Sequence, residues 1–554
     1  MVSGAAPAPD EVERLLDSLP IRAKAAQLVM PWLGGTYTAD DAESLAQAER
    51  WVGSLGVGGL IVSVGSPLDI AAKLNHLQSK ARIPLLVASD LEAGTAIRLA
   101  GGVAFPTNMG VAAGGRDSDA YTMGRITAQE ARAVGIHLAF APVADVNNNP
   151  ANPIINIRSF GEDPRMVARF VAAAVRGMEE HGLLATAKHF PGHGDTETDT
   201  HLSLPALPAD WRRLDSLELV PFRAAVASGA SAVMSAHLAF PTLGGPAGRP
   251  GTVMPEVLTG ILRDSLGFNG LVVTDALDMG ALVSAYGAGE AAVLALIAGA
   301  DLLLQPAGAE AAVSAIVRAV ETGRVSEERL DRSVRRVLAL KQRIGLFEQR
   351  TVPLEHVTRV VGSAPHWQAA REVAARSIVL LKDSSSALDA LRRRAGRIAL
   401  VTYAEEQNLT AGTALASELR NAGHTVATFR LWPASGPASL DSVRALLRGG
   451  ARPVFAVGVR PMPWRGTVGM PESLADLVRE TARARPTILV SLGSPYLIAQ
   501  APEVAAYLIG WSATPAAEWA AARALSGAAI GGRLPTRVPP RYPLGAGLER
   551  GAVR

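Results

Sequence analysis

Three of the ten histidines in this chain lie within thirteen positions of one another, in the segment KHFPGHGDTETDTH. They are His189, His193 and His201, and the three acidic residues of the segment lie between the last two of them. The first two are four residues apart, a spacing that would suit a zinc ion if both lay on one face of a helix. Pro191 and the glycines beside it disfavour a helix, so the segment is predicted to be a loop. A metal site is therefore the less favoured interpretation, and no metal or other cofactor is expected.

The end of this loop contains a second possible site, the triplet Asp199-Thr200-His201. In an extended stretch, a carboxylate two residues from an imidazole can accept a hydrogen bond from Nδ1–H. That bond fixes the tautomer and raises the basicity of the other ring nitrogen. Such a pair suits general acid/base catalysis near neutral pH, which contributes about 10²–10⁴ in rate. The alternative is a surface turn with a histidine that has no catalytic role.

Other residues that could take part in catalysis or binding lie close to apolar runs. Asp275 directly ends the run GLVVTD, where a carboxylate can serve as a nucleophile, an electrostatic stabiliser or a metal ligand. Asp90 and Arg98 lie in SDLEAGTAIRL, Arg158 ends an asparagine-rich loop, and Lys188 precedes the first loop histidine. One acceptor and several cations suit the hydroxyls and the amide or carboxylate substituent of a sugar ring. The alternative is an ion-pair network that braces the loops.

The elements that would position these residues alternate regularly through the first two thirds of the chain. Short apolar runs are separated by stretches with helical spacing, and eight such units in about 300 residues predict a (β/α)₈ barrel rather than a doubly wound sheet. In such a barrel the active site forms at the C-terminal ends of the strands. The polar residues at the predicted ends are Asp90, Asp145, Lys188 with His189, His237 and Asp275.

The composition of the chain changes after LALKQRIGLF (338–347). We predict a barrel over residues 1–348, a linker over 349–374 and an α/β sandwich domain over 375–554. The last region alternates β-branched runs with helical stretches, which is typical of a mostly parallel sheet. Its proline- and glycine-rich end is predicted to be a strap over the surface of this domain.

The composition narrows the function classes further. The 554 residues include 54 basic and 51 acidic side chains and no cysteine, which argues against a nucleic-acid partner and excludes thiolate chemistry. Aromatic residues make up only 5%, which favours a small closed pocket over a long polysaccharide platform. No apolar stretch predicts a membrane span. No signal peptide is visible, so a cytoplasmic location is expected, or a secreted or periplasmic one if a signal was removed.

At this point the motifs together resemble glycoside hydrolase family 3. The similar segments are KHFPGHGDTETDTH, RSFGEDP, DLEAGTAIR and GLVVTDALDM, and the DTH triplet resembles the family's β-N-acetylglucosaminidase branch. The later segments VSLGSPYLI and GGRLPTRVP resemble the second domain of two-domain members. Two motifs depart from the common pattern: Leu-Glu-Ala-Gly follows Asp90 where many relatives have Gln-Glu-Gly-Gly, and Ala276 follows Asp275 where many have a second aspartate.

The resemblance implies a role for each matched residue. Asp275 corresponds to the nucleophile that forms a covalent glycosyl-enzyme, His201 to the acid/base and Asp199 to its orienting partner. The residues that correspond to those holding the non-reducing N-acetylglucosamine (GlcNAc) are Asp90, Arg98, Arg158, Lys188 and His189.

The resemblance thus implies a retaining exo-β-N-acetylglucosaminidase acting on peptidoglycan- or chitin-derived fragments. Phosphorolysis to GlcNAc-1-phosphate is an alternative, because a histidine acid/base becomes neutral after donating its proton and would not repel phosphate. A β-glucosidase or β-xylosidase on the same fold, a metal-dependent barrel hydrolase and a non-catalytic sugar-binding protein are the other hypotheses.

Overall fold

The computed structural model describes residues 9–198, 204–243, 248–462 and 466–553. The chain divides into two compact units, and neither is continuous in sequence. The first unit consists of Met1–Val103, Gly124–Asp145 and Val171–Ser363. The second consists of Ala104–Met123, Val146–Phe170 and Ala364–Arg554. Each unit is described by itself.

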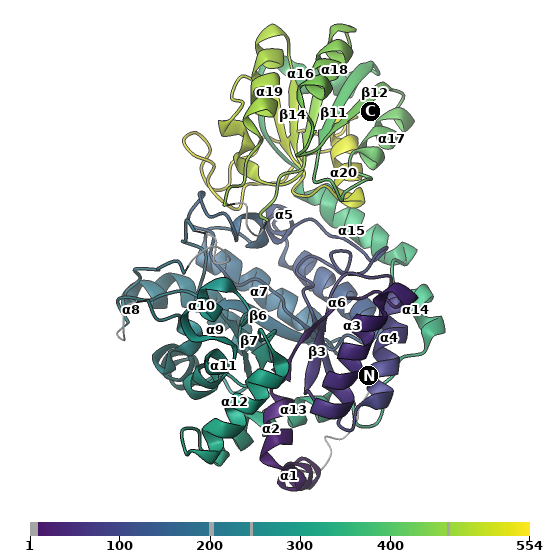
Figure 1. Ribbon diagram of the computed structural model, residues 1–554. Helices are drawn as coiled ribbons and strands as arrows, with labels where there is room; N and C mark the ends of the chain where they lie inside the picture. The colour runs from purple at the N-terminus through teal and green to yellow at the C-terminus, as the bar shows by residue number, and fades with distance from the viewer. Residues whose placement is uncertain (1–8, 199–203, 244–247, 463–465, 554) are drawn as a thin grey trace. The chain divides into compact units, whose positions relative to one another are not determined.

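The first unit is built on parallel strands that follow one another in sequence order, and Figure 1 shows β3, β6 and β7 with helices outside them. The seven hydrogen-bonded strands are β2 (Trp32–Leu33), β3 (Gly59–Val62), β4 (Leu86–Ser89), β5 (Leu138–Ala139), β6 (Leu184–Phe190), β7 (Ala232–Ser235) and β8 (Leu271–Val273). Six of them are buried along their whole length, as expected for a parallel sheet covered on both faces.

Both ends of this curled sheet reach a further short pair of strands. Strand β1 (Val29–Met30), just before β2, pairs in parallel with β9 (Leu303–Leu304). At the other end, Val273 of β8 forms a parallel bridge with Leu302, and Thr274 N donates to Leu302 O at 3.0 Å. Backbone hydrogen bonds therefore connect β8 to β2 through β9 and β1.

The helices of this unit carry apolar stripes toward the strands. In α13, for example, Leu330, Val334, Val337 and Leu338 are buried at three- and four-residue spacing. The helices are α1 (Pro9–Ser18), α2 (Ile21–Gln27), α3 (Ala42–Glu49), α4 (Pro67–Lys80), α8 (Trp211–Arg213), α9 (Leu219–Ala227), α10 (Gly280–Tyr286), α11 (Ala288–Ala298), α12 (Ala309–Glu321), α13 (Glu327–Arg343) and α14 (Leu354–Val360). Two more, α6 (Asp117–Ala133) and α7 (Pro164–Glu179), have residues in both units.

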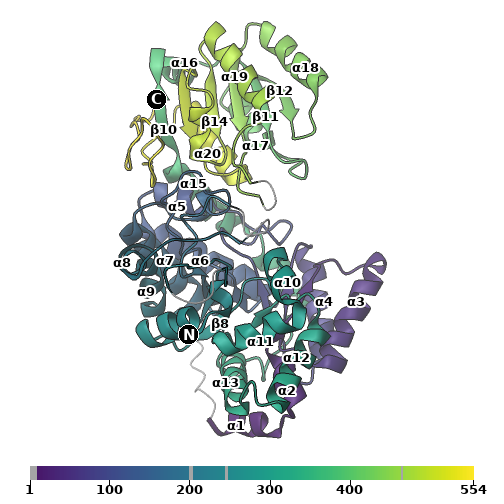
Figure 2. The same ribbon diagram turned by 60° about the vertical axis from the view of Figure 1, so that its left-hand side comes forward.

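The second unit contains one six-stranded sheet in the order β10-β15-β14-β13-β11-β12, shown with its helices in Figure 2. All neighbours are parallel except β10 with β15. The strands are β10 (Val379–Asp383), β11 (Arg397–Tyr403), β12 (Thr425–Leu431), β13 (Arg452–Val457), β14 (Ile488–Ser491) and β15 (Ala506–Ile509). The helices are α5 (Asn108–Ala113), α15 (Ala364–Ser377), α16 (Ala387–Arg393), α17 (Thr413–Asn421), α18 (Pro437–Arg448), α19 (Glu472–Ala484) and α20 (Pro515–Leu525).

The sequence patterns and the structure agree on an α/β fold with mostly parallel sheets. The run 137–146 is shorter as a strand than its apolar length suggests: Leu138–Ala139 form the strand, Val143 forms only an isolated bridge with Lys188, and Pro142 between them has no N–H to donate. Residues 349–374, expected to be a linker, contain α14 and most of α15. Among the described residues, no helix is both long and apolar enough to cross a membrane.

Candidate active site

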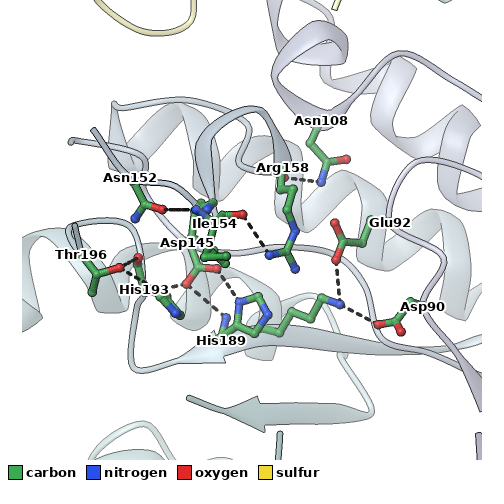
Figure 3. Close-up of polar contacts among 12 residues, drawn as sticks. Asp90, Glu92, Asn108, Asp145, Asn152, Ile154, Arg158, His189, His193 and Thr196 are labelled. Carbon is green, nitrogen blue, oxygen red and sulfur yellow. Dashed lines mark hydrogen bonds and ion pairs between the residues drawn. The ribbon is translucent and has the colours of Figure 1, made fainter. Parts of the chain in front are cut away.

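A cluster of opposite charges lies where β4 and β6 of the first unit end. Lys188 Nζ contacts Asp90 Oδ1 at 3.0 Å and Glu92 Oε1 at 2.8 Å (Figure 3). Arg98 Nη2 contacts Asp90 Oδ2 at 2.9 Å. The Lys188 side chain is only 3% exposed, whereas that of Asp90 is 34% exposed. Asp90 is therefore held by two cations and keeps a face open to a ligand.

The loop that carries Arg98 is fixed by hydrogen bonds to a buried carboxylate. Glu130 of α6 accepts hydrogen bonds from the Thr95 hydroxyl and from Val103 N, the latter at 3.0 Å. Its other oxygen accepts from Gly362 N at 2.9 Å. Because both ends of the loop are tied to one buried side chain, Arg98 is presented to Asp90 by a rigid segment.

The charge cluster predicts a specific pH dependence of stability. Burial raises the pKa of Asp90, but the Lys188 ammonium and the Arg98 guanidinium outweigh it, so this pKa lies below its ordinary value. The ionised carboxylate thus stabilises the fold above its unfolded pKa of about 4, and this stabilisation is lost as pH falls through the folded pKa. We expect Asp90→Asn to reduce the slope of the unfolding free energy against pH below about pH 4, measured by urea unfolding. If the slope of the unfolding free energy against pH is the same in Asp90→Asn and the wild-type protein, the ion pairs of Asp90 do not stabilise the fold.

A buried acid orients the histidine next to Lys188. Asp145, which is fully buried, lies 2.7 Å through Oδ2 from His189 Nδ1, and its Oδ1 accepts from His189 N at 3.1 Å and His193 N at 2.7 Å (Figure 3). The register of β6 against β7 shifts between Lys188 and Phe190, so His189 is an extra residue in the strand. Such irregularities re-aim side chains beside active sites. Asp145 thus fixes the orientation of the His189 ring through Nδ1.

The same aspartate anchors the start of the glycine-rich loop. Beyond His193, Thr196 Oγ1 lies 2.9 Å from His193 Nδ1, and Asp195 is paired with Arg213 Nη2 at 2.6 Å. Gly192 has a φ of 137°, and a Cβ there would lie 2.6 Å from Glu218 Cγ, so only glycine fits. The predicted dyad of Asp199 and His201 lies outside the described residues.

Asp275 is positioned by the end of β8. Thr274 fixes this end, since its N–H donates to Leu302 O at 3.0 Å and its Oγ1 accepts from Leu304 N at 2.9 Å. The half-buried Asp275 accepts from Ala276 N at 2.8 Å.

The charges around Asp275 keep it ionised. Burial raises the pKa of Asp275, yet it lies below its ordinary value because His237, His189, the Ala276 N–H and Lys188 favour the charged form. An anion next to cationic and imidazole groups is the state required of a carboxylate nucleophile.

His237, which follows β7, contacts the backbone of Ala276, the residue after Asp275. Its Nε2 lies 2.9 Å from Ala276 O, and because a carbonyl only accepts, Nε2 carries the proton. Its Nδ1 lies 2.7 Å from the buried Thr252 hydroxyl. His237 is 2% exposed, so the ring is buried as well as hydrogen-bonded at both nitrogens.

We expect His237→Ala to lower kcat by about 10- to 100-fold while KM changes little, because the turn that aims Asp275 would lose its donor. Steady-state kinetics on an aryl β-GlcNAc substrate measures this, with thermal unfolding as the folding check. Equal loss in kcat and in substrate affinity would instead mean that His237 contacts the sugar.

Arg158 belongs to the second unit, in the segment Val146–Phe170. Its Nη1 donates to Ile154 O at 3.1 Å, and its own carbonyl accepts from Asn108 Nδ2 at 2.7 Å (Figure 3). The buried Asn152 caps the same loop by accepting from Ile154 N and Ile155 N at 2.9 and 2.7 Å. Arg158 is thus fixed to its own loop through its guanidinium and to α5 through its carbonyl oxygen.

The structure therefore brings five predicted site residues into the first unit: Asp90, Arg98, Lys188, His189 and Asp275. Two partners were not assigned from the sequence. Glu92 shares Lys188 with Asp90, and its position two residues beyond a strand-end aspartate was the available signal. The sequence indicates that Asp145 lies at a strand end, but its position along the chain does not indicate that its carboxylate contacts His189.

Within the described residues, no group of three or more histidine, aspartate and glutamate side chains is arranged to hold a metal ion. Of the pair with zinc-like spacing, the His189 ring contacts Asp145, whereas the His193 ring lies 2.9 Å through Nδ1 from the Thr196 hydroxyl. The arrangement favours acid, base and nucleophile chemistry on a polar substrate.

Carboxylates, imidazoles and a buried lysine at the C-terminal ends of parallel strands are typical of the active sites of α/β enzymes. The model of the glycosyl hydrolase family 3 N-terminal domain matches residues 20–340, and the chain belongs to this family.

Several known proteins are similar to it. A β-N-acetylglucosaminidase/β-glucosidase of Cellulomonas fimi is 37% identical over 371 residues, covering 66% of this chain and 65% of that protein. The β-hexosaminidase A of Pseudoalteromonas piscicida is 33% identical over 347 residues, covering 58% and 57%. The chain thus matches less than two thirds of the length of either relative. The solved family 3 β-N-acetylglucosaminidase of Paenibacillus sp. FPU-7 has a TM-score of 0.83 at 34% identity, covering 94% of this chain and 99% of that one.

Proposed function

We propose that the protein is a retaining exo-β-N-acetylglucosaminidase that releases GlcNAc from the non-reducing end of peptidoglycan- or chitin-derived fragments. The observation that carries this proposal is Asp275, a half-buried carboxylate kept ionised by imidazoles and Lys188 at a strand end. The cluster of Asp90, Arg98 and Lys188 in the same unit supplies the polar groups that sugar hydroxyls require. Its relatives named β-hexosaminidase and β-N-acetylglucosaminidase support the choice of substrate.

The proposed fold of the catalytic region is a (β/α)₈ barrel over residues 1–348. The backbone contacts that join β8 to β9 and β1 support closure of its sheet. After a connecting segment over 349–374, residues 375–554 would form the second domain, an α/β sandwich with a C-terminal strap. In a barrel, every predicted strand end opens onto one pocket, which would gather the catalytic groups.

The proposed reaction has two steps. In the first, His201, oriented by Asp199, donates its proton to the glycosidic oxygen as the C1–O bond breaks, and a carboxylate oxygen of Asp275 bonds to C1. In the second, neutral His201 removes a proton from water, the water oxygen bonds to C1, and the bond to Asp275 breaks. Two inversions give a product with the anomeric configuration of the substrate.

The remaining assigned residues would hold the sugar that is cleaved. Asp90 would accept hydrogen bonds from two neighbouring hydroxyls, because Lys188 and Arg98 keep it charged. His189, whose Nδ1 is held by Asp145, would bind a further sugar oxygen, and a sugar-binding role for Arg158, which belongs to the second unit, stays a prediction from the sequence. A closed end of this kind accommodates a terminal sugar and excludes the middle of a chain.

A substrate panel tests the proposal. Purified protein is assayed on 4-nitrophenyl β-GlcNAc, 4-nitrophenyl β-glucoside and N,N′-diacetylchitobiose, in phosphate and in a phosphate-free buffer. We expect the highest kcat/KM with the N-acetylated aryl glycoside and free GlcNAc as the product in both buffers. A preference for the glucoside would refute the substrate assignment, and GlcNAc-1-phosphate in phosphate buffer would replace hydrolysis with phosphorolysis.

A further inference from the structure

Trp32, in the short strand β2, is an unusual residue for a parallel sheet because its side chain is exposed. Trp32 is 47% exposed, whereas the next residue, Leu33, is 1% exposed. No role was assigned to this tryptophan from the sequence, although the chain has few aromatic residues. A single exposed apolar side chain is common on protein surfaces, whereas several gathered in one place mark a binding surface, so the neighbours of Trp32 decide its role.

The strand register shows which way Trp32 points. Trp32 pairs with Ile61, and Ile61 pairs with Ala88 of β4. Residues paired in parallel strands direct their side chains to the same face, and side chains alternate along each strand. Asp90 lies two residues beyond Ala88, so Trp32 and Asp90 project from the same face of the sheet.

The pairings on the other side of Trp32 give the same result. Met30, two residues before Trp32, pairs with Leu304. Leu302, two residues before Leu304, bridges to Val273 of β8. Asp275 lies two residues beyond Val273. Trp32 therefore lies on the face of the sheet that carries Ala88 and Val273, the residues two positions before Asp90 and Asp275.

The loops next to Trp32 add further exposed apolar side chains. Val64 follows β3 and is 58% exposed, and Ile97 precedes Arg98 and is 43% exposed. Backbone hydrogen bonds join these loops: Gly35 N donates to Val64 O and Gly65 N donates to Arg98 O, both at 3.1 Å. The three apolar side chains therefore belong to adjoining loops at the ends of β2, β3 and β4, and Ile97 is the neighbour in sequence of Arg98, which pairs with Asp90.

This apolar surface differs from the charged cluster in its exposure to solvent. The Lys188 side chain is 3% exposed and that of Asp90 is 34% exposed, while Trp32 and its two apolar neighbours are each more than 40% exposed. In a pocket that holds one terminal sugar, the buried polar groups bind that sugar. The part of the substrate beyond that sugar then extends over the more exposed surface.

We propose that Trp32, flanked by Val64 and Ile97, forms the +1 subsite and binds the aglycone, the group attached to the departing oxygen. The aglycone class that fits is a second pyranose or an aryl group, because both offer a flat apolar face to an indole ring. This inference rests on the proposed function, and it assigns the specificity for the leaving group to Trp32.

The test compares two substrates that differ only beyond the cleaved bond: N,N′-diacetylchitobiose, with a sugar aglycone, and methyl β-GlcNAc, with none. We expect Trp32→Ala to lower kcat/KM for the disaccharide by about five- to tenfold and to leave the methyl glycoside within twofold. Trp32→Phe, which keeps a ring, should restore most of the loss. Leu354→Ala, which truncates a 40% exposed side chain on α14, is the matched control and should change neither value.

The outcomes separate this inference from the proposed function. If the wild-type protein cleaves both substrates but Trp32→Ala reduces both equally, or neither, the +1 assignment is wrong and the proposed function stands. If the wild-type protein cleaves neither substrate, the proposed function fails and the subsite fails with it. Thermal unfolding of each variant confirms that the comparison is made on folded protein.

Discussion

Replacing Asp275 by alanine is expected to abolish turnover. Without its carboxylate no bond to C1 can form in the first step, and loss of a nucleophile costs on the order of 10⁴-fold or more in kcat. The measurement is the steady-state rate on 4-nitrophenyl β-GlcNAc. Addition of azide, a small anion that can occupy the vacated space and attack C1, should restore activity and give the α-glycosyl azide.

The matched control for this variant is Asp278→Ala. Asp278 lies three residues further along the same loop, is exposed, and accepts a hydrogen bond from Gln305 Nε2 at 2.8 Å. Asp278→Ala also removes a carboxylate, but this carboxylate does not lie at the end of β8. The variant should therefore keep its activity. Equal activity of Asp275→Ala and the wild-type protein would end the assignment of Asp275 as nucleophile.

Replacing His201 by alanine is expected to have the second-largest effect, and one that depends on the leaving group. Protonation of the departing oxygen contributes about 10²–10⁴ in rate when the alcohol is a poor leaving group. It contributes far less when the leaving group is an acidic phenol. We therefore expect a large loss of kcat/KM on N,N′-diacetylchitobiose and a small loss on 2,4-dinitrophenyl β-GlcNAc.

The partner of His201 gives an internal comparison. Asp199→Asn keeps the shape of the side chain and removes its charge, so the imidazole should lose basicity and the basic limb of the kcat/KM–pH profile should move to lower pH. Because Asp275 has a pKa below its ordinary value, the acid limb should lie below the usual range of an aspartate in both proteins. A profile unchanged by Asp199→Asn would mean that these two residues are not coupled.

Much of this organisation follows from local sequence patterns. Apolar runs of four to eight residues mark parallel strands because both faces of each strand are covered, and the polar residue that ends a run therefore marks the strand end. Asp90, Lys188 and Asp275 could be selected in this way, because each ends or interrupts such a run.

The contacts between these residues could not be predicted, because they depend on strand register and on loops distant in sequence. The spacing of Asp145 shows that it ends a strand, and only the fold places it 2.7 Å from His189. The link from His237 to Ala276 joins positions 39 residues apart. The exposure of Trp32 contradicts its apolar context, which would place it in the core.

The division of the chain into units was also beyond the reach of local patterns. Residues 104–123 and 146–170 lie between segments of the first unit but pack with residues 364–554. One link is the pair of Arg376 on α15 with Asp119 on α6, at 2.8 Å. Another is Asn147, which donates to Tyr496 Oη at 3.1 Å. Contacts across 250 residues or more leave no periodic signal in the sequence.

The central claim is that Asp275 forms a covalent bond to the sugar, and trapping that species tests it most directly. The protein is incubated with a fluorinated GlcNAc donor that forms the glycosyl-enzyme faster than water removes it, then analysed by intact mass and peptide mapping. We predict one added glycosyl group, on the peptide that contains Asp275, and none on Asp275→Ala. Rapid turnover with no adduct, and a first product of inverted anomeric configuration, would contradict the account.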